Sequence, residues 1–151
     1  MGISPPFFLK MEALKNLCNN LLSDVNNAIN IILMRKEIQD FIVKLNQEQL
    51  HKENVDSENV LLPYYTKYSY ELKQQKFGND YPKRFTLQDT GDFYDSMKLY
   101  LKKDYFMIIG NTKKENKDLF SYSPNIMGLT EESIELLIEK INPLIIDELT
   151  K

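Results

Sequence analysis

The sequence has 151 residues, of which 42% are hydrophobic and 27% are charged, and its formal net charge is −3 at pH 7. These values exclude an intrinsically disordered chain and argue against a general nucleic-acid-binding protein, whose surface would be strongly basic. The length suits a single domain over residues 1–151, and the lone cysteine excludes an internal disulfide. Apolar runs such as residues 31–34 are far shorter than the roughly 20 residues that span a bilayer, so we expect no membrane partner.

The first 50 residues carry the strongest periodic signal in the chain. Between residues 11 and 32, apolar residues recur at alternating spacings of three and four, which places them on one face of a helix. They are Met11, Leu14, Cys18, Leu21, Val25, Ala28 and Ile32. A second stripe, shifted by one residue, contains Ile31, Met34, Ile38, Phe41 and Leu45. The pattern predicts an N-terminal helical part over residues 9–50 that either changes the face it buries or bends near Asn30.

This helical part is long for a small domain. A continuous helix over residues 9–50 would measure about 60 Å, so a partner subunit would have to cover part of it. The spacing also fits a coiled coil, but Asn26, Asn27 and Asn30 beside the stripe do not supply the charges that usually select a coiled-coil partner. We therefore favour a helix that lies on a sheet, with Cys18 as a small buried side chain.

Residues 51–88 show no clean period and predict an irregular insertion, with one or two helical turns in YYTKYSYELKQQ. Tyrosines crowd this segment, and half-buried tyrosines suit an interface between proteins. The candidate interface residues are Tyr64, Tyr65, Tyr68 and Tyr70. The alternative is that these side chains pack the insertion onto the body. His51, the only histidine, opens a polar run and is predicted to lie on the solvated surface.

Residues 89–128 are predicted to form a turn and a β-hairpin. Asp89, Asp92 and Asp95 in DTGDFYD stand three residues apart, a spacing that does not match a calcium-binding loop. A short helical turn explains the segment better: Asp89 or Thr90 caps it, and Asp92 and Asp95 favour its first turn. The residues that define this turn are Thr90, Gly91, Phe93, which points inward, and Ser96, which ends it.

The segment after the turn changes to a period of two. The alternation from Met97 predicts a β-hairpin whose turn is LysLysAsp and whose second strand is YFMII. The later segment LFSYSP is predicted to form a third short strand or an irregular edge. Residues 129–151 predict a C-terminal helix with Thr130 as its N-cap and a kink or split at Pro143. Its predicted apolar face contains Ile134, Leu137, Ile138, Ile141, Ile145 and Leu149. The resulting fold class is α+β, with N-terminal and C-terminal helices packed on a small antiparallel sheet.

No sequence feature points to catalysis. The motifs GxGxxG, GxxxxGK[ST], GxSxG and HExxH are absent, and a single histidine excludes metal sites that need two. We therefore expect no enzyme activity, no catalytic residues, no metal and no cofactor. Lysines cluster around the hairpin at Lys98, Lys102, Lys103, Lys113, Lys114 and Lys117, whereas the terminal helix is acidic. Opposite charges on two parts of one chain would suit head-to-tail packing of identical copies in a ring.

The order of these parts resembles that of the small tail-completion and minor tail proteins of tailed bacteriophages, which act at the head-to-tail joint. In that family a TG-x-[LF]-x-x-S turn leads into the sheet, and here the turn runs from Thr90 to Ser96 with Phe93 at the aromatic position. Residues 121–137, SYSPNIMGLTEESIELL, are also similar to structural proteins of phages and prophages of Bacteroidetes hosts. The similarity covers about residues 85–140.

The resemblance implies a virion structural protein without turnover chemistry. It would be assembled in the bacterial cytoplasm as a ring-forming connector or tail-completion subunit at the phage neck or tail. Its partners would be other copies of itself and the portal, adaptor or tail-tube proteins, and DNA contact would be at most indirect, through the channel. The alternative function is a small phage-encoded or host-encoded inhibitor that binds one protein target.

Overall fold

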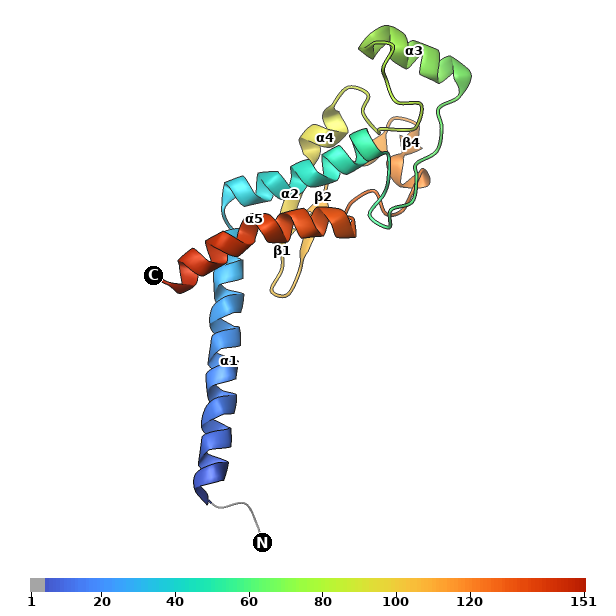
Figure 1. The fold of residues 1–151 in the computed structure, drawn as a ribbon. Helices are drawn as coiled ribbons and strands as arrows, with labels where there is room; N and C mark the ends of the chain where they lie inside the picture. Colours follow the sequence, from blue (N-terminus) through green and yellow to red (C-terminus); the bar gives the residue numbers. More distant parts are fainter. Residues whose placement is uncertain (1–4) are drawn as a thin grey trace.

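The computed structural model describes residues 5–151, with side chains from Met11 onward, and it confirms the α+β class. Figure 1 shows a long helical stalk joined to a body of helices, loops and short strands. The helices are α1 (Pro5–Leu33), α2 (Lys36–Glu48), α3 (Lys67–Phe77), α4 (Asp92–Ser96) and α5 (Glu131–Leu149). The strands of the described residues form two antiparallel pairs, β1 (Lys98–Leu101) with β2 (Phe106–Ile109) and β3 (Lys113–Lys114) with β4 (Lys117–Asp118).

The N-terminal helical part bends, which is one of the two predicted arrangements. The break falls at Met34 and Arg35, about one turn of helix beyond Asn30. The side chain of Gln39 donates from Nε2 to the carbonyl of Leu33 at 3.0 Å, so it satisfies one of the carbonyls that the end of α1 leaves free. Ile32 before the break and Ile38 after it are both fully buried, and the change of direction allows both to reach the same core.

The sequence favoured an N-terminal helix that lies on the sheet, and this arrangement holds only for the second part of that helical region, α2. α2 packs on β1, whereas α1 contacts α5 and α2 at its C-terminal end and then projects away from the body (Figure 1). Ala28 and Ile32 are buried at that end, but residues 11–24 are exposed along their whole length. About half of the predicted apolar stripe therefore lies outside the core.

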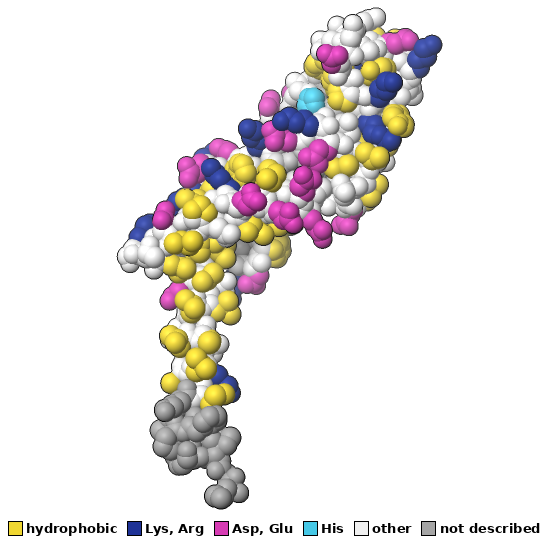
Figure 2. Space-filling view, in the orientation of Figure 1, with side chains coloured by type: hydrophobic (Ala, Val, Ile, Leu, Met, Phe, Trp, Pro, Cys, Tyr) yellow, Lys and Arg dark blue, Asp and Glu magenta, His cyan; other side chains and the backbone are white. Residues whose placement is uncertain are grey.

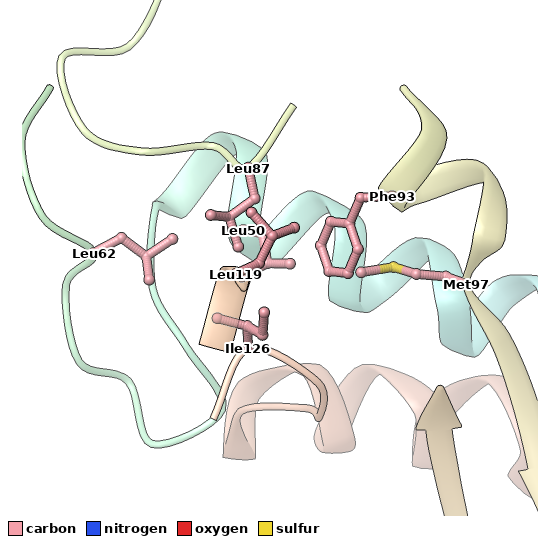
Figure 3. Close-up of a cluster of buried hydrophobic side chains, with 7 residues drawn as sticks. All are labelled: Leu50, Leu62, Leu87, Phe93, Met97, Leu119 and Ile126. Carbon is pink, nitrogen blue, oxygen red and sulfur yellow. The ribbon is translucent and has the colours of Figure 1, made fainter. Parts of the chain in front are cut away.

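Two apolar clusters hold the body together, and α2 contributes the partly buried Val43 to the first and three buried residues to the second. The first lies between the end of α2, the insertion and the turn around α4, and it contains Leu50, Leu62, Leu87, Phe93, Met97, Leu119 and Ile126 (Figure 3). The second joins α1, α2, β2 and α5 and contains Ile32, Ile38, Ile42, Leu45, Ile108 and Leu137. The second cluster fixes the direction in which α1 leaves the body.

The predicted hairpin is confirmed. β1 pairs with β2 from Lys98 opposite Ile109 to Leu101 opposite Phe106, and the amide of Lys102 closes the turn on the carbonyl of Tyr105 at 2.8 Å. The segment LFSYSP forms no strand, because its first residues adopt a 3-10 turn over Leu119–Ser121. The second hairpin, β3–β4, instead lies in the polar connection NTKKENKD, where no period of two marks it.

The terminal helix starts as predicted but does not split. The hydroxyl of Thr130 accepts from the amide of Ser133 at 3.2 Å, which is the geometry of an N-cap. α5 runs through Pro143 as one helix to Leu149. Because Pro143 has no amide hydrogen, the carbonyl of Glu139 receives no hydrogen bond from it within the helix. Glu139 is exposed, so water can bind this carbonyl. Of the predicted apolar face, Leu137 is buried and Ile141 and Ile145 are half-buried, whereas Ile134, Ile138 and Leu149 are exposed.

Two fully buried amide side chains of α2 and its π-helical extension (Gln49–Glu53) join that helix to the start of α5. Asn46 donates from Nδ2 to the carbonyl of Ile126 at 3.1 Å. Gln49 donates from Nε2 to the carbonyl of Gly128 at 3.0 Å, and its Oε1 accepts from the amide of Thr130 at 2.9 Å. Because both side chains are fully buried, the loss of these bonds would leave buried polar groups unpaired.

We predict that Gln49→Leu lowers the free energy of unfolding by about 1–3 kcal/mol, because the amide of Thr130 and the carbonyl of Gly128 lose their partners. Chemical denaturation followed by circular dichroism measures the change. Gln75→Leu on the exposed side of α3 is the matched control and should stay near the wild-type value. Equal stabilities of the two variants would show that the buried amide does not hold α2 to α5.

Candidate functional site

The most prominent surface feature is an uncovered apolar stripe on α1. Within the stripe Leu21 is 58% and Leu14 is 55% exposed, and Leu17 at 65% and Leu22 at 61% exposure flank it. Figure 2 shows hydrophobic side chains following one another along the projecting helix. Cys18 belongs to this stripe and is exposed, so the prediction of a buried Cys18 was wrong: the face is apolar, but nothing in the body covers it.

The stripe continues the face by which α1 packs on the body. Ala28 and Ile32, which are buried, follow Val25 at the same three-and-four spacing that relates Leu14, Cys18 and Leu21. The opposite face carries asparagines, and within residues 11–25 the charged residues are Glu12, Lys15 and Asp24. The stripe can therefore bind a second apolar helix face in the way that α5 binds Ala28 and Ile32.

The four predicted interface tyrosines differ in exposure. Tyr68 is 71% exposed on α3 and Tyr64 is 62% exposed just before it, whereas Tyr65 and Tyr70 are half-buried. The guanidinium of Arg84 lies 3.9 Å from the ring centre of Tyr64 and also donates to the carbonyl of Leu62 at 2.8 Å, so Tyr64 is held in place. Tyr64 and Tyr68 remain available for a neighbour.

Tyr65 faces a groove of about 790 Å³ between α3, the segment before α4, and the β3–β4 hairpin. The ring centre of Phe85 lies 4.4 Å from that of Tyr65 and 4.3 Å from that of Tyr122. All three residues line the groove. Lys73, Asp89 and Lys114 are among its polar lining residues. An aromatic surface with charges of both signs around it suits a protein side chain better than a ligand of one charge.

A second tyrosine cluster lies inside the body and has a structural role. The hydroxyl of Tyr81 lies 2.6 Å from that of Thr86, and the hydroxyl of Tyr94 donates to the carbonyl of Thr86. His51 packs against the rings of Tyr81 and Tyr94 and is half-buried, so its predicted place on the solvated surface was wrong. Burial holds the pKa of His51 below its usual value and raises the pKa of Tyr94.

The turn around α4 is a short helix as predicted, but Gly91 stands at its N-cap in place of Asp89 or Thr90, and this N-cap makes no side-chain hydrogen bond. Gly91 adopts a φ of 94°, which favours glycine, and Phe93 is 1% exposed within the first apolar cluster (Figure 3). The hydroxyl of Ser96 donates to the carbonyl of Phe93 at 2.7 Å and accepts from the amide of Asn111 at 2.8 Å, so it joins the turn to the end of the hairpin. Thr90 accepts from the amide of Asp92 at 3.4 Å.

Asp89 does not cap the turn. Its carboxylate accepts from Nζ of Lys73 on α3 at 3.0 Å, and this hydrogen bond lowers the pKa of Asp89. The carboxylate of Asp92 instead accepts from the hydroxyl of Thr90, so Asp89 and Asp92 have different partners. Among the residues that the structure describes, no group of acidic, histidine and cysteine side chains is placed to hold a metal ion.

Charge is distributed unevenly over the body. Glu58, Glu131, Glu132 and Glu135 line a groove of about 590 Å³ at the start of α5. The lysines of the two hairpins lie elsewhere on the chain, where Lys98, Lys102, Lys103, Lys113 and Lys117 are exposed and Lys114 is half-buried. The sequence indicated the acidic start of α5, but it could not indicate that Glu58 from the insertion joins it, because that contact depends on the fold.

Within the described part of the chain, no helix is both long and apolar enough to cross a bilayer. Comparisons with models of protein families, with curated protein sequences and with solved structures find no significant match. The function must therefore be inferred from the surfaces described above and from the sequence itself.

Proposed function

We propose that this chain is a self-assembling structural protein and, more specifically, a ring-forming connector or tail-completion subunit at the neck or tail of a bacteriophage. The observation that carries the proposal is the uncovered apolar stripe on the projecting part of α1. The phage assignment rests on the similarity of the Thr90–Ser96 turn and of residues 121–137 to phage structural proteins.

The energetics favour a covered stripe. Burying one leucine side chain contributes about 1.5–3 kcal/mol, and four exposed leucines follow one another on α1. A helix without tertiary support is marginal in water, so the projecting part of α1 gains stability when a neighbour packs against it. Proteins that act as monomers rarely leave a continuous apolar surface of this kind open to solvent.

The charges of the body suit repeated contacts between identical copies. In a ring, each subunit presents one surface to the next and a different surface to the previous one. The acidic groove lined by Glu58, Glu131 and Glu132 is complementary to the lysines of the hairpins, which lie on other elements. A contact between these surfaces would orient neighbours, while the α1 stripe would supply most of the free energy.

The rival function is an inhibitor that covers the stripe with one foreign protein. Such a protein would form a stoichiometric complex with its target and would have no reason to assemble with itself. The body also exposes Ile134, Ile138 and Leu149 on α5, a second apolar surface that a single small target would leave open. Two apolar surfaces and two charged surfaces on one chain favour several neighbours over one.

We predict that Leu14→Lys with Leu21→Lys abolishes self-assembly and leaves the body folded, because both side chains are exposed in the isolated chain. Light scattering after gel filtration measures the oligomer, and circular dichroism monitors the fold. Asn16→Lys with Ser23→Lys is the matched control, since it adds the same charge at the same seven-residue spacing on the opposite face. A wild-type chain that stays monomeric at high concentration would contradict the proposal.

We also predict that the protein is present in purified particles of the phage or prophage that encodes it, in several copies per particle. Quantitative mass spectrometry of the particles measures that number against the tail-tube protein. Presence in infected cells together with absence from particles would contradict the phage assignment and favour the inhibitor.

A further inference from the structure

We propose that the α1 helices of neighbouring copies associate in parallel and in register as a bundle of more than two helices, with Cys18 of each copy in the same layer. This inference rests on the proposed self-assembly and identifies the occupant of the stripe as α1 of a second copy. It is carried by the heptad spacing of the exposed residues, by an exposed leucine on each flank and by the position of the body at one end of the helix.

The exposed seam has the spacing of a coiled coil. With Met11 at position a, the a positions are Met11, Cys18, Val25 and Ile32, and the d positions are Leu14, Leu21 and Ala28. A strict alternation of three and four residues keeps such a seam facing a partner helix that supercoils with it. The exposed part of the seam, residues 11–25, keeps this spacing over two heptads, and its continuation at Ala28 and Ile32 is buried on the body.

The remaining positions of the heptad agree with the same assignment. The b, c and f positions between residues 12 and 30 are polar except for Ala13: Glu12, Asn16, Asn19, Asn20, Ser23, Asn26, Asn27 and Asn30. The asparagines that seemed to argue against a coiled coil therefore lie on its outer face. There they need no partner and remain solvated.

The flanking e and g positions indicate the number of helices. Leu17 at g and Leu22 at e are both more than half exposed, whereas Lys15 at e and Asp24 at g are charged. Ile29 and Ile31 occupy the e and g positions beyond them. A two-stranded coiled coil usually carries charges at these positions, because they face water. Leu17 and Leu22, one on each flank, widen the stripe between the charged positions, so that each helix can contact one neighbour on each side, as in a bundle or ring.

The position of the body favours the parallel direction. Ala28 and Ile32 are covered by α5 of the same chain, so the body lies at the C-terminal end of the free seam. In a parallel bundle the bodies lie side by side, where the acidic groove of one copy can meet the lysines of the next. In an antiparallel pair they would lie at opposite ends of a seam of 15 residues, about 22 Å long.

Disulfide cross-linking of the full-length chain tests this arrangement, because Cys18 is the only cysteine and is exposed. We expect the oxidant diamide to convert the wild-type oligomer into Cys18–Cys18 dimers, resolved on a non-reducing gel. At micromolar chain concentration the reaction should be about a thousandfold faster than between free chains, because thiols held in one assembly meet at effective concentrations near millimolar. The variant Cys18→Ser with Asn20→Cys, whose thiol lies on the outer face, is the control and should lose this acceleration.

A mixing experiment tests the direction of the helices. Chains with Cys18 are mixed with chains that carry Cys18→Ser and Leu21→Cys, which places the only thiol at a d position. In an antiparallel pair the a positions of one helix face the d positions of the other. Preferential cross-links between the two kinds of chain would therefore indicate antiparallel helices and overturn the parallel arrangement. An oligomer in which Cys18 reacts no faster than the outer-face control would overturn the α1 bundle but leave self-assembly intact. A monomeric chain would overturn both proposals.

Discussion

A helix of 29 residues leaves the body of this protein with its apolar face uncovered, and this constraint governs the rest of the molecule. The same face is buried at Ala28 and Ile32 and exposed at Leu14, Leu21 and Leu22, so the change from buried to exposed side chains occurs along one continuous stripe. The body is large enough to cover only the last turns of the helix. An isolated helix of this kind has little reason to stay folded in water, and a second apolar helix would supply the contacts that the body lacks.

The body can be understood as the part that fixes the direction of α1. The break at Met34 and Arg35 allows Ile32 and Ile38 to enter one cluster, and Arg35 pairs with Glu148 of α5 at 3.3 Å. The amides of Asn46 and Gln49 in turn attach α2 to the segment that starts α5. These contacts connect α1, α2 and α5 into one unit, on whose surface the hairpins, the acidic groove and the exposed tyrosines have fixed positions. In the proposed ring, that unit would orient neighbours while α1 holds them together.

Local patterns in the sequence predicted much of this fold, because periodicity reports directly which residues share a face. It predicted the stripe on α1, the β1–β2 hairpin, the turn from Thr90 to Ser96 and the N-cap at Thr130. Periodicity does not report what covers a face. For that reason the sequence predicted a buried Cys18, whereas the side chain is exposed. The shift of the stripe predicted a bend near Asn30 as one of two arrangements, but no glycine or proline marks its place after Leu33, which depends on the packing of Ile32 and Ile38. The groove beside Phe85 and the contacts of Gln49 join residues far apart in the chain, so no local pattern could indicate them.

Amide hydrogen exchange of residues 11–25 as a function of chain concentration tests the central claim most directly. If copies of the chain cover the stripe, these amides should exchange rapidly in dilute solution and become protected as the concentration rises, while the amides of α2 remain protected throughout. Protection of residues 11–25 that does not change with concentration would mean that one chain stabilises its own helix. Rapid exchange at every concentration would mean that no second copy binds it, and either result would contradict the account.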